Sequence, residues 1–123
     1  MLPRLIKSFE YAQRGVAQAW KEELNFRIEV VMTIIVLLLA WWLELDKIKI
    51  SILALVCGFV LVLELINTII EHISDVLKPR LDHYVRQIKD LSSGAVLIAS
   101  VMALVVGICL LLPPLWALLS WQA

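Results

Sequence analysis

The sequence is poor in the residues and motifs on which most soluble enzymes and metalloproteins depend. Its only two cysteines, Cys57 and Cys109, lie inside apolar runs, without a Cys-x-x-Cys pair or the Cys/His spacing of a zinc site. We therefore predict that both are small buried hydrophobic residues. The chain also lacks the G-x-x-x-x-G-K-[ST] loop and the G-x-G-x-x-G loop that hold nucleotide phosphates in common soluble folds. The common soluble nucleotide-binding folds that depend on these loops are therefore excluded.

A net charge is also lacking. Eleven basic and eleven acidic residues cancel among the 123 residues, so we expect no nucleic-acid partner, because no overall positive field would attract one. A cleavable signal peptide is not expected either, because basic residues precede the first long apolar run. They are Arg4, Lys7, Arg14, Lys21 and Arg27. We expect the N-terminus to stay on the cytoplasmic side.

Apolar residues are abundant. They make up 62% of the chain, whereas soluble domains contain about 45–50%, and the mean hydropathy is +0.91. Because about 20 apolar residues span a bilayer, we predict transmembrane helices over about residues 27–45, 48–71 and 90–112. We expect the third helix to stop at Pro113 and Pro114, which cannot continue the backbone hydrogen bonding. The predicted fold is a single all-α integral membrane domain over residues 1–123.

The segment before the first span has helical periodicity. Its apolar residues recur every three or four positions, with charged residues between them, which is typical of an amphipathic helix. The apolar positions are Leu5, Ile6, Phe9, Ala12, Val16 and Trp20. We predict a surface helix over about residues 4–24 on the inner leaflet. The alternative is a helix that packs on other cytoplasmic helices.

The basic residues predict the orientation of the chain. Five precede the first span, four follow the second (Lys78, Arg80, Arg86 and Lys89), and only Lys47 and Lys49 lie in the first connection. The positive-inside rule therefore places the N-terminus and the second connection in the cytoplasm, and the C-terminus outside. Trp41, Trp42, Trp116 and Trp121 then fall near the outer interface, where such rings concentrate.

The second span carries a polar stripe. Glu64, Asn67, Glu71 and Asp75 share one helical face at about 100° per residue. A carboxylate inside the membrane is expensive and marks a functional site by default, although interhelical hydrogen bonding alone is an alternative. Such residues suit phosphoryl transfer, which needs a base, metal-binding carboxylates and cations near the phosphates. They also suit a small proton-coupled transporter that uses Glu64, and a non-catalytic scaffold is a third possibility.

The third span carries small residues at every fourth position: Ala95, Ala99, Ala103 and Gly107. Such a stripe lets helix backbones approach closely. Because three spans can hardly enclose intramembrane carboxylates, we expect a homo-oligomer with shared sites.

The polar residues resemble a known signature. The run from Glu64 to Glu71, followed by Asp75 and Lys89-Asp90, resembles the E-x-x-N-[ST]-x-x-E…D…K-D pattern of the prokaryotic diacylglycerol kinases and their undecaprenol kinase relatives. The resemblance implies a homotrimer in the bacterial inner membrane, with three transmembrane helices and a surface helix per subunit. It also implies ATP- and Mg²⁺-dependent phosphorylation of a lipid alcohol, at subunit interfaces near the cytoplasmic face.

The resemblance also implies residue roles. Glu64 corresponds to the general base, and Glu23 and Glu71 to the Mg²⁺ ligands. The predicted nucleotide and phosphate pocket comprises Arg4, Lys7, Tyr11, Asn67, Lys89 and Asp90. The order Asp82-His83-Tyr84 departs from the family pattern, so the adenine contacts and a role for His83 are left unassigned. The expected reaction converts diacylglycerol to phosphatidic acid, and the alternative converts undecaprenol to undecaprenyl phosphate.

Overall fold

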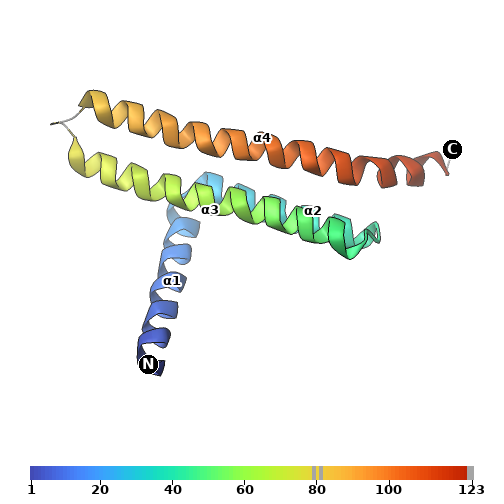
Figure 1. Ribbon diagram of the computed structural model, residues 1–123, viewed down its shortest axis with the longest axis horizontal. Coiled ribbons are helices and arrows are strands. Elements are labelled where there is room, and N and C mark those ends of the chain that lie inside the picture. The colour runs from blue at the N-terminus through green and yellow to red at the C-terminus, as the bar shows by residue number, and fades with distance from the viewer. Residues whose placement is uncertain (79, 81, 122–123) are drawn as a thin grey trace.

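Four helices make up the part of the chain that the computed structural model describes, residues 1–78, 80 and 82–121. They are α1 (Leu2–Glu22), α2 (Leu24–Trp42), α3 (Lys47–Leu77) and α4 (Asp82–Ser120). Figure 1 shows α2, α3 and α4 side by side along a common direction, with α1 extending away from them. The last three helices are long and apolar enough to cross a membrane. The prediction of an all-helical chain with three such helices is confirmed.

The corner between α1 and α2 is a single residue, Glu23. Its backbone is extended, with φ −105° and ψ 110°, so the chain changes direction there. The Glu23 N–H still donates to the Ala19 carbonyl oxygen at 2.9 Å, which closes the last turn of α1. Ala19 is the buried residue of α1, and the apolar side chains nearer the N-terminus, such as Phe9, are exposed. A transverse helix with an uncovered apolar face favours the membrane-surface interpretation.

Helices α3 and α4 are longer than a membrane requires. The 31 residues of α3 extend about 46 Å at the helical rise, whereas the hydrocarbon core is about 30 Å thick. Both helices continue past the predicted spans at the end where they are joined. Packing persists there, since Ser74 of α3 and Val85 of α4 are each 1% exposed. The paired extension carries Asp75 and Lys89 beyond the predicted membrane boundary.

The predicted stop at Pro113 and Pro114 is wrong, because α4 runs through both prolines to Ser120. The φ angle of proline is compatible with a helix, and each proline removes only one backbone donor. Membrane helices tolerate this loss where neighbouring groups satisfy the freed carbonyls. In addition, Leu111 and Leu115, on either side of the prolines, pack in the apolar core with Leu53 of α3.

The α2–α3 turn and the C-terminal end of α4 lie at the same end of the bundle (Figure 1). Glu44 in this turn has a left-handed φ of 52°. Asp46 caps α3 by accepting a hydrogen bond from the Lys49 backbone N–H at 2.9 Å, which lowers the pKa of the Asp46 carboxyl. The four predicted interface tryptophans lie on the helix ends that meet here, or just beyond them, and all are exposed.

Two predictions about small residues need correction. Ala99 is 6% exposed and is close-packed, as expected, but Ala103 and Gly107 line a cavity. A Cβ atom added to Gly107 would have no neighbour within 4 Å, so these two small residues leave space open. The prediction of two buried cysteines is also wrong, because Cys57 is only partly buried and lines the same cavity, and Cys109 is exposed.

Candidate functional site

The polar stripe of α3 passes from buried to exposed. Glu64 is 3% exposed and Asn67 is 9% exposed, whereas Glu71 is partly exposed and Asp75 is exposed. This order follows the predicted path from the membrane interior to the cytoplasm. The stripe therefore connects a buried carboxylate with water along one helix face.

A chain of hydrogen bonds fixes the middle of the stripe. Asn67 Nδ2 donates to Glu71 Oε1 at 3.2 Å. Ser92 Oγ, from α4, donates to Asn67 Oδ1 at 2.7 Å, and this bond is buried. Because both polar ends of the Asn67 amide are engaged, its orientation and that of Glu71 are coupled to α4.

Lys89 forms the second link between α3 and α4. Its Nζ donates a hydrogen bond to Asp75 Oδ1 at 2.8 Å, and the two side chains form an ion pair. Both residues lie outside the predicted spans. The hydrogen bond from Lys89 lowers the pKa of Asp75 and raises the pKa of Lys89. Lys89 is therefore held as a cation beside the exposed end of the stripe.

Three carboxylates lie near one another where the α1–α2 corner meets α3. Glu23 and Glu71 lie close enough to Glu64 to repel it electrostatically, and the Asn25 side chain lies beside it. Glu23 reaches this place because the α1–α2 corner positions it there. The end of α1 also approaches α3 at Glu22, whose Oε2 is 4.0 Å from His72 Nε2. The structure thus brings the predicted base and both predicted metal ligands together.

These residues fit a magnesium ion that is shared with a nucleotide. Among the described residues, no three Asp, Glu, His or Cys side chains form a metal-binding group. Mg²⁺ does not need one, because it keeps several waters and binds through one or two carboxylates together with substrate phosphates. Glu23 and Glu71 supply two hard oxygen donors, and the crowding of like charges around Glu64 favours a cation.

Other predicted residues are not brought to this cluster. Arg4, Lys7 and Tyr11 are exposed on α1, towards its N-terminal end, which points away from the bundle (Figure 1). The Tyr11 ring is instead covered by Arg14, whose guanidinium carbon is 5.5 Å from the ring centroid. Asp90 is exposed at the start of the third predicted span.

His83, to which the sequence assigns no role, packs edge-on against Tyr84 with ring centroids 5.8 Å apart. This contact between neighbouring residues gives His83 no link to the carboxylates.

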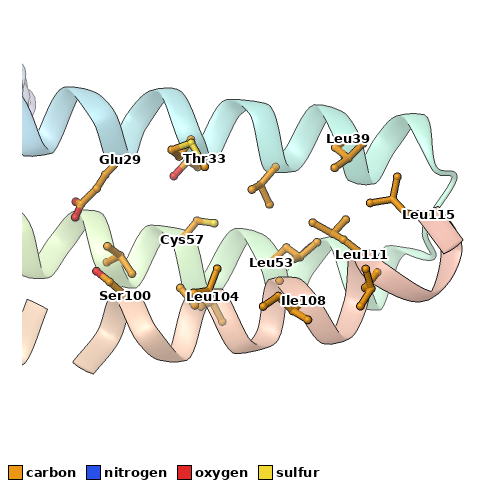
Figure 2. Close-up of a pocket in the computed structure, with 17 residues that line it drawn as sticks. Glu29, Thr33, Leu39, Leu53, Cys57, Ser100, Leu104, Ile108, Leu111 and Leu115 are labelled. Carbon is orange, nitrogen blue, oxygen red and sulfur yellow. The ribbon is translucent and has the colours of Figure 1, made fainter. Parts of the chain in front are cut away.

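An apolar cavity of about 530 Å³ lies between α2, α3 and α4. Figure 2 shows Glu29 and Ser100 towards one end and Leu115 at the other. Its lining is almost wholly apolar, and it includes Val60, one helical turn before Glu64. The cavity and the polar stripe therefore meet near Glu64.

Glu29 is a residue that the sequence prediction missed. Its Oε2 atom is buried and, among the described residues, has no hydrogen-bond partner. The carboxylate lines the cavity and interacts electrostatically with Glu64. The sequence contained a usable signal, because Glu29 is an acidic residue within the predicted span 27–45 and such residues are functional by default.

Comparison with known proteins identifies the family. The profile of the prokaryotic diacylglycerol kinases matches residues 10–111, which include the stripe, Glu23 and Lys89-Asp90. The chain belongs to this family. A diacylglycerol kinase from Synechocystis is 42% identical over 118 residues, which are 95% of this chain and 67% of the relative.

Two further relatives span almost the whole chain. An undecaprenol kinase from Bacillus subtilis is 33% identical over 93% of both chains. A diacylglycerol kinase from Escherichia coli K12 is 30% identical over 97% of this chain and 90% of its own. The family is one of lipid kinases, and its members have different lipid alcohols in their names.

Proposed function

We propose that the protein is a lipid kinase that transfers the γ-phosphate of ATP to the hydroxyl of diacylglycerol and forms phosphatidic acid. The observation that carries this proposal is the meeting of the polar stripe with the apolar cavity near Glu64. A lipid tail requires an apolar space, and a nucleotide requires water and charge. The two environments adjoin at a buried carboxylate.

Each residue of the cluster has a defined task in this reaction. Glu64 accepts the proton of the lipid hydroxyl, whose oxygen bonds to the γ-phosphorus while the bond to the bridging oxygen of ADP breaks. Glu23 and Glu71 hold Mg²⁺, which neutralises phosphate charge when it is bound. Asn67 orients Glu71, and Lys89 exchanges Asp75 for a phosphate oxygen. Asp90 lies next to Lys89 at the nucleotide side.

The cavity is the proposed place of one lipid chain. Binding sites for small molecules usually have volumes of about 300–1,000 Å³ and are mostly apolar, with a few polar groups that fix the orientation. The cavity has this size and lining, and Glu29 is the polar group at its end. A lipid chain among Leu53, Ala103 and Gly107 would present its hydroxyl towards Glu64.

We predict that Ala103→Leu raises the KM for the lipid by about 10-fold or more, because even a single misplaced methylene in an apolar pocket changes discrimination by that amount. The KM for ATP and the assembly should not change. Ala117→Leu is the matched control, since Ala117 is exposed on the same helix beyond the prolines. Steady-state kinetics with varied lipid in mixed micelles checks the prediction. An unchanged lipid KM would place the lipid chain elsewhere.

The proposed assembly is a homotrimer in the bacterial cytoplasmic membrane, with the N-terminus inside and the C-terminus outside. The distribution of basic residues supports this orientation. Arg4, Lys7 and Tyr11 lie far along α1 from the carboxylates of their own chain. We propose that α1 carries them towards the nucleotide pocket of a neighbouring copy, which makes the site a shared one.

The test of the function is phosphorylation of defined lipids by the purified protein in micelles, with ATP, Mg²⁺ and either diacylglycerol or undecaprenol. We expect phosphatidic acid to form faster than undecaprenyl phosphate. Faster formation of undecaprenyl phosphate would establish the second candidate, which the undecaprenol kinase relative supports through its match over 93% of both chains.

The absence of any phosphorylated lipid would refute the kinase proposal. Nucleotide-independent proton flux in vesicles would then support the transporter alternative based on Glu64. If neither activity occurred, the result would support the third possibility, a non-catalytic membrane scaffold.

A further inference from the structure

Ser92 is the only residue of α4 whose side chain, among those described, makes a buried hydrogen bond to the polar stripe. The residue is 8% exposed, and its hydroxyl lies 2.7 Å from Asn67 Oδ1. Serine hydroxyls in helices commonly bond to their own backbone one turn earlier, as Ser51 does with the Lys47 carbonyl oxygen at 2.7 Å. The Ser92 hydroxyl is directed across the helix interface instead.

The direction of this hydrogen-bond chain follows from the chemistry of its ends. An ionised Glu71 carboxylate can only accept hydrogen bonds. Asn67 must therefore turn its NH₂ group towards Glu71, which agrees with the distance of 3.2 Å between Asn67 Nδ2 and Glu71 Oε1. The amide oxygen then faces α4, and Ser92 must act as the donor. If the amide turned over, its oxygen would face the Glu71 carboxylate, which cannot donate, and that contact would be repulsive.

We infer that Ser92 is a positioning residue that acts through Asn67 to fix the Glu71 carboxylate for metal binding. The inference rests on the proposed function, because Glu71 is a metal ligand only in that reaction. Asn67 engages Oε1 of Glu71, which leaves Oε2 for another partner. Ser92 and Lys89 are less than one helical turn apart on α4, so the same helix sets the phosphate-binding cation and the orientation of a metal ligand.

Removing the hydroxyl should loosen Glu71 without deleting any proposed ligand. In Ser92→Ala, the Asn67 oxygen stays buried without its donor, so the amide is no longer anchored to α4 and holds Glu71 less firmly. Loss of an outer partner of a metal ligand typically lowers metal affinity by about 10–100-fold. We expect a loss in that range for the metal–nucleotide complex, and recovery of most of the turnover at saturating Mg²⁺.

The test measures metal affinity directly. Mn²⁺ is the probe, and its binding to the full-length protein in micelles is followed by electron paramagnetic resonance with a non-hydrolysable ATP analogue present. Ser92→Ala should weaken Mn²⁺ binding by about 10-fold or more, and Ser92→Thr, which keeps a hydroxyl, should restore most of it. Ser51→Ala removes a helical serine hydroxyl at the far end of the bundle and should leave Mn²⁺ binding unchanged.

A double-mutant cycle separates positioning from general stability. Because Ser92 acts through Asn67, Ser92→Ala should add little further loss of Mn²⁺ affinity in an Asn67→Ala background, whereas independent effects would add. If Ser92→Ala does not assemble, Ser92→Cys keeps the approximate shape with a weaker donor and should show the same weakened binding.

Wild-type Mn²⁺ affinity in Ser92→Ala, or in Ser92→Cys where that variant is needed, would overturn the inference. So would full additivity in the cycle. Failure of the wild-type protein to phosphorylate any lipid would instead refute the proposed function, so the two failures are distinguishable.

Discussion

Glu64→Gln should lower kcat for lipid phosphorylation by about 10²–10⁴-fold, the usual contribution of general acid–base catalysis. Glutamine keeps the size of glutamate and its hydrogen-bonding capacity, but it cannot take the proton of the lipid hydroxyl. The affinity for ATP and Mg²⁺ should stay nearly intact, because Glu64 is the most buried member of the stripe at 3% exposed and lies deepest below the water-facing end.

Glu29 provides a comparison variant that tests whether Glu64 is the base. It is a second carboxylate at the cavity, electrostatically coupled to Glu64, and therefore the alternative base. Glu29→Gln should lower kcat far less than Glu64→Gln does. Single-turnover measurements with saturating nucleotide separate the chemical step from binding. If Glu29→Gln produces the large loss and Glu64→Gln does not, the roles of the two carboxylates are exchanged.

Features that depend on local periodicity could be predicted from the sequence. Uncharged runs of about 20 residues identify membrane helices because hydrogen bonding in the bilayer forces the backbone into a helix. The stripe from Glu64 to Asp75 follows from 3.6 residues per turn, and the observed gradient of exposure agrees with it. Glu23 lies near Glu64 and Glu71, but local periodicity does not predict the one-residue corner that brings it there.

Features that depend on packing between helices could not be predicted in this way. The continuation of α4 through Pro113 is one example, because the penalty of a proline depends on its surroundings. The cavity is another, since Ala103 and Gly107 form the same sequence pattern whether they permit close contact or leave a space. The Ser92–Asn67 bond joins residues 25 positions apart, and its existence depends on the register of α4 against α3.

The roles predicted for the residues on α1 depend on contacts between copies of the chain. The family resemblance assigns Arg4, Lys7 and Tyr11 to the nucleotide pocket, but within one chain they are remote from Glu71. Their assignment stays a prediction, because the distances that matter to it are those between copies. Crosslinking between cysteines introduced at Lys7 and Asp90 of different subunits is the direct measurement of that proximity.

Glu71→Gln should abolish most turnover through loss of metal rather than loss of the base. We expect at least a 100-fold decrease in activity at moderate Mg²⁺, because loss of only an outer partner of a ligand already lowers metal affinity by about 10–100-fold. In contrast to Glu64→Gln, the variant should bind nucleotide more weakly whenever Mg²⁺ is present. Assembly should be unaffected, since Glu71 is partly exposed and glutamine can still accept a hydrogen bond from Asn67.

The comparison of the two variants assigns the roles. Nucleotide affinity is measured by calorimetry with and without Mg²⁺, and turnover is measured on the same preparations. Glu10→Gln is the control for removing a carboxylate, because Glu10 pairs only with Arg14 on the exposed surface of α1, 3.6 Å away. Wild-type activity of Glu71→Gln at saturating Mg²⁺ would refute metal binding by Glu71. A loss of nucleotide affinity in Glu64→Gln, with affinity retained in Glu71→Gln, would mean that the base and the ligand are exchanged.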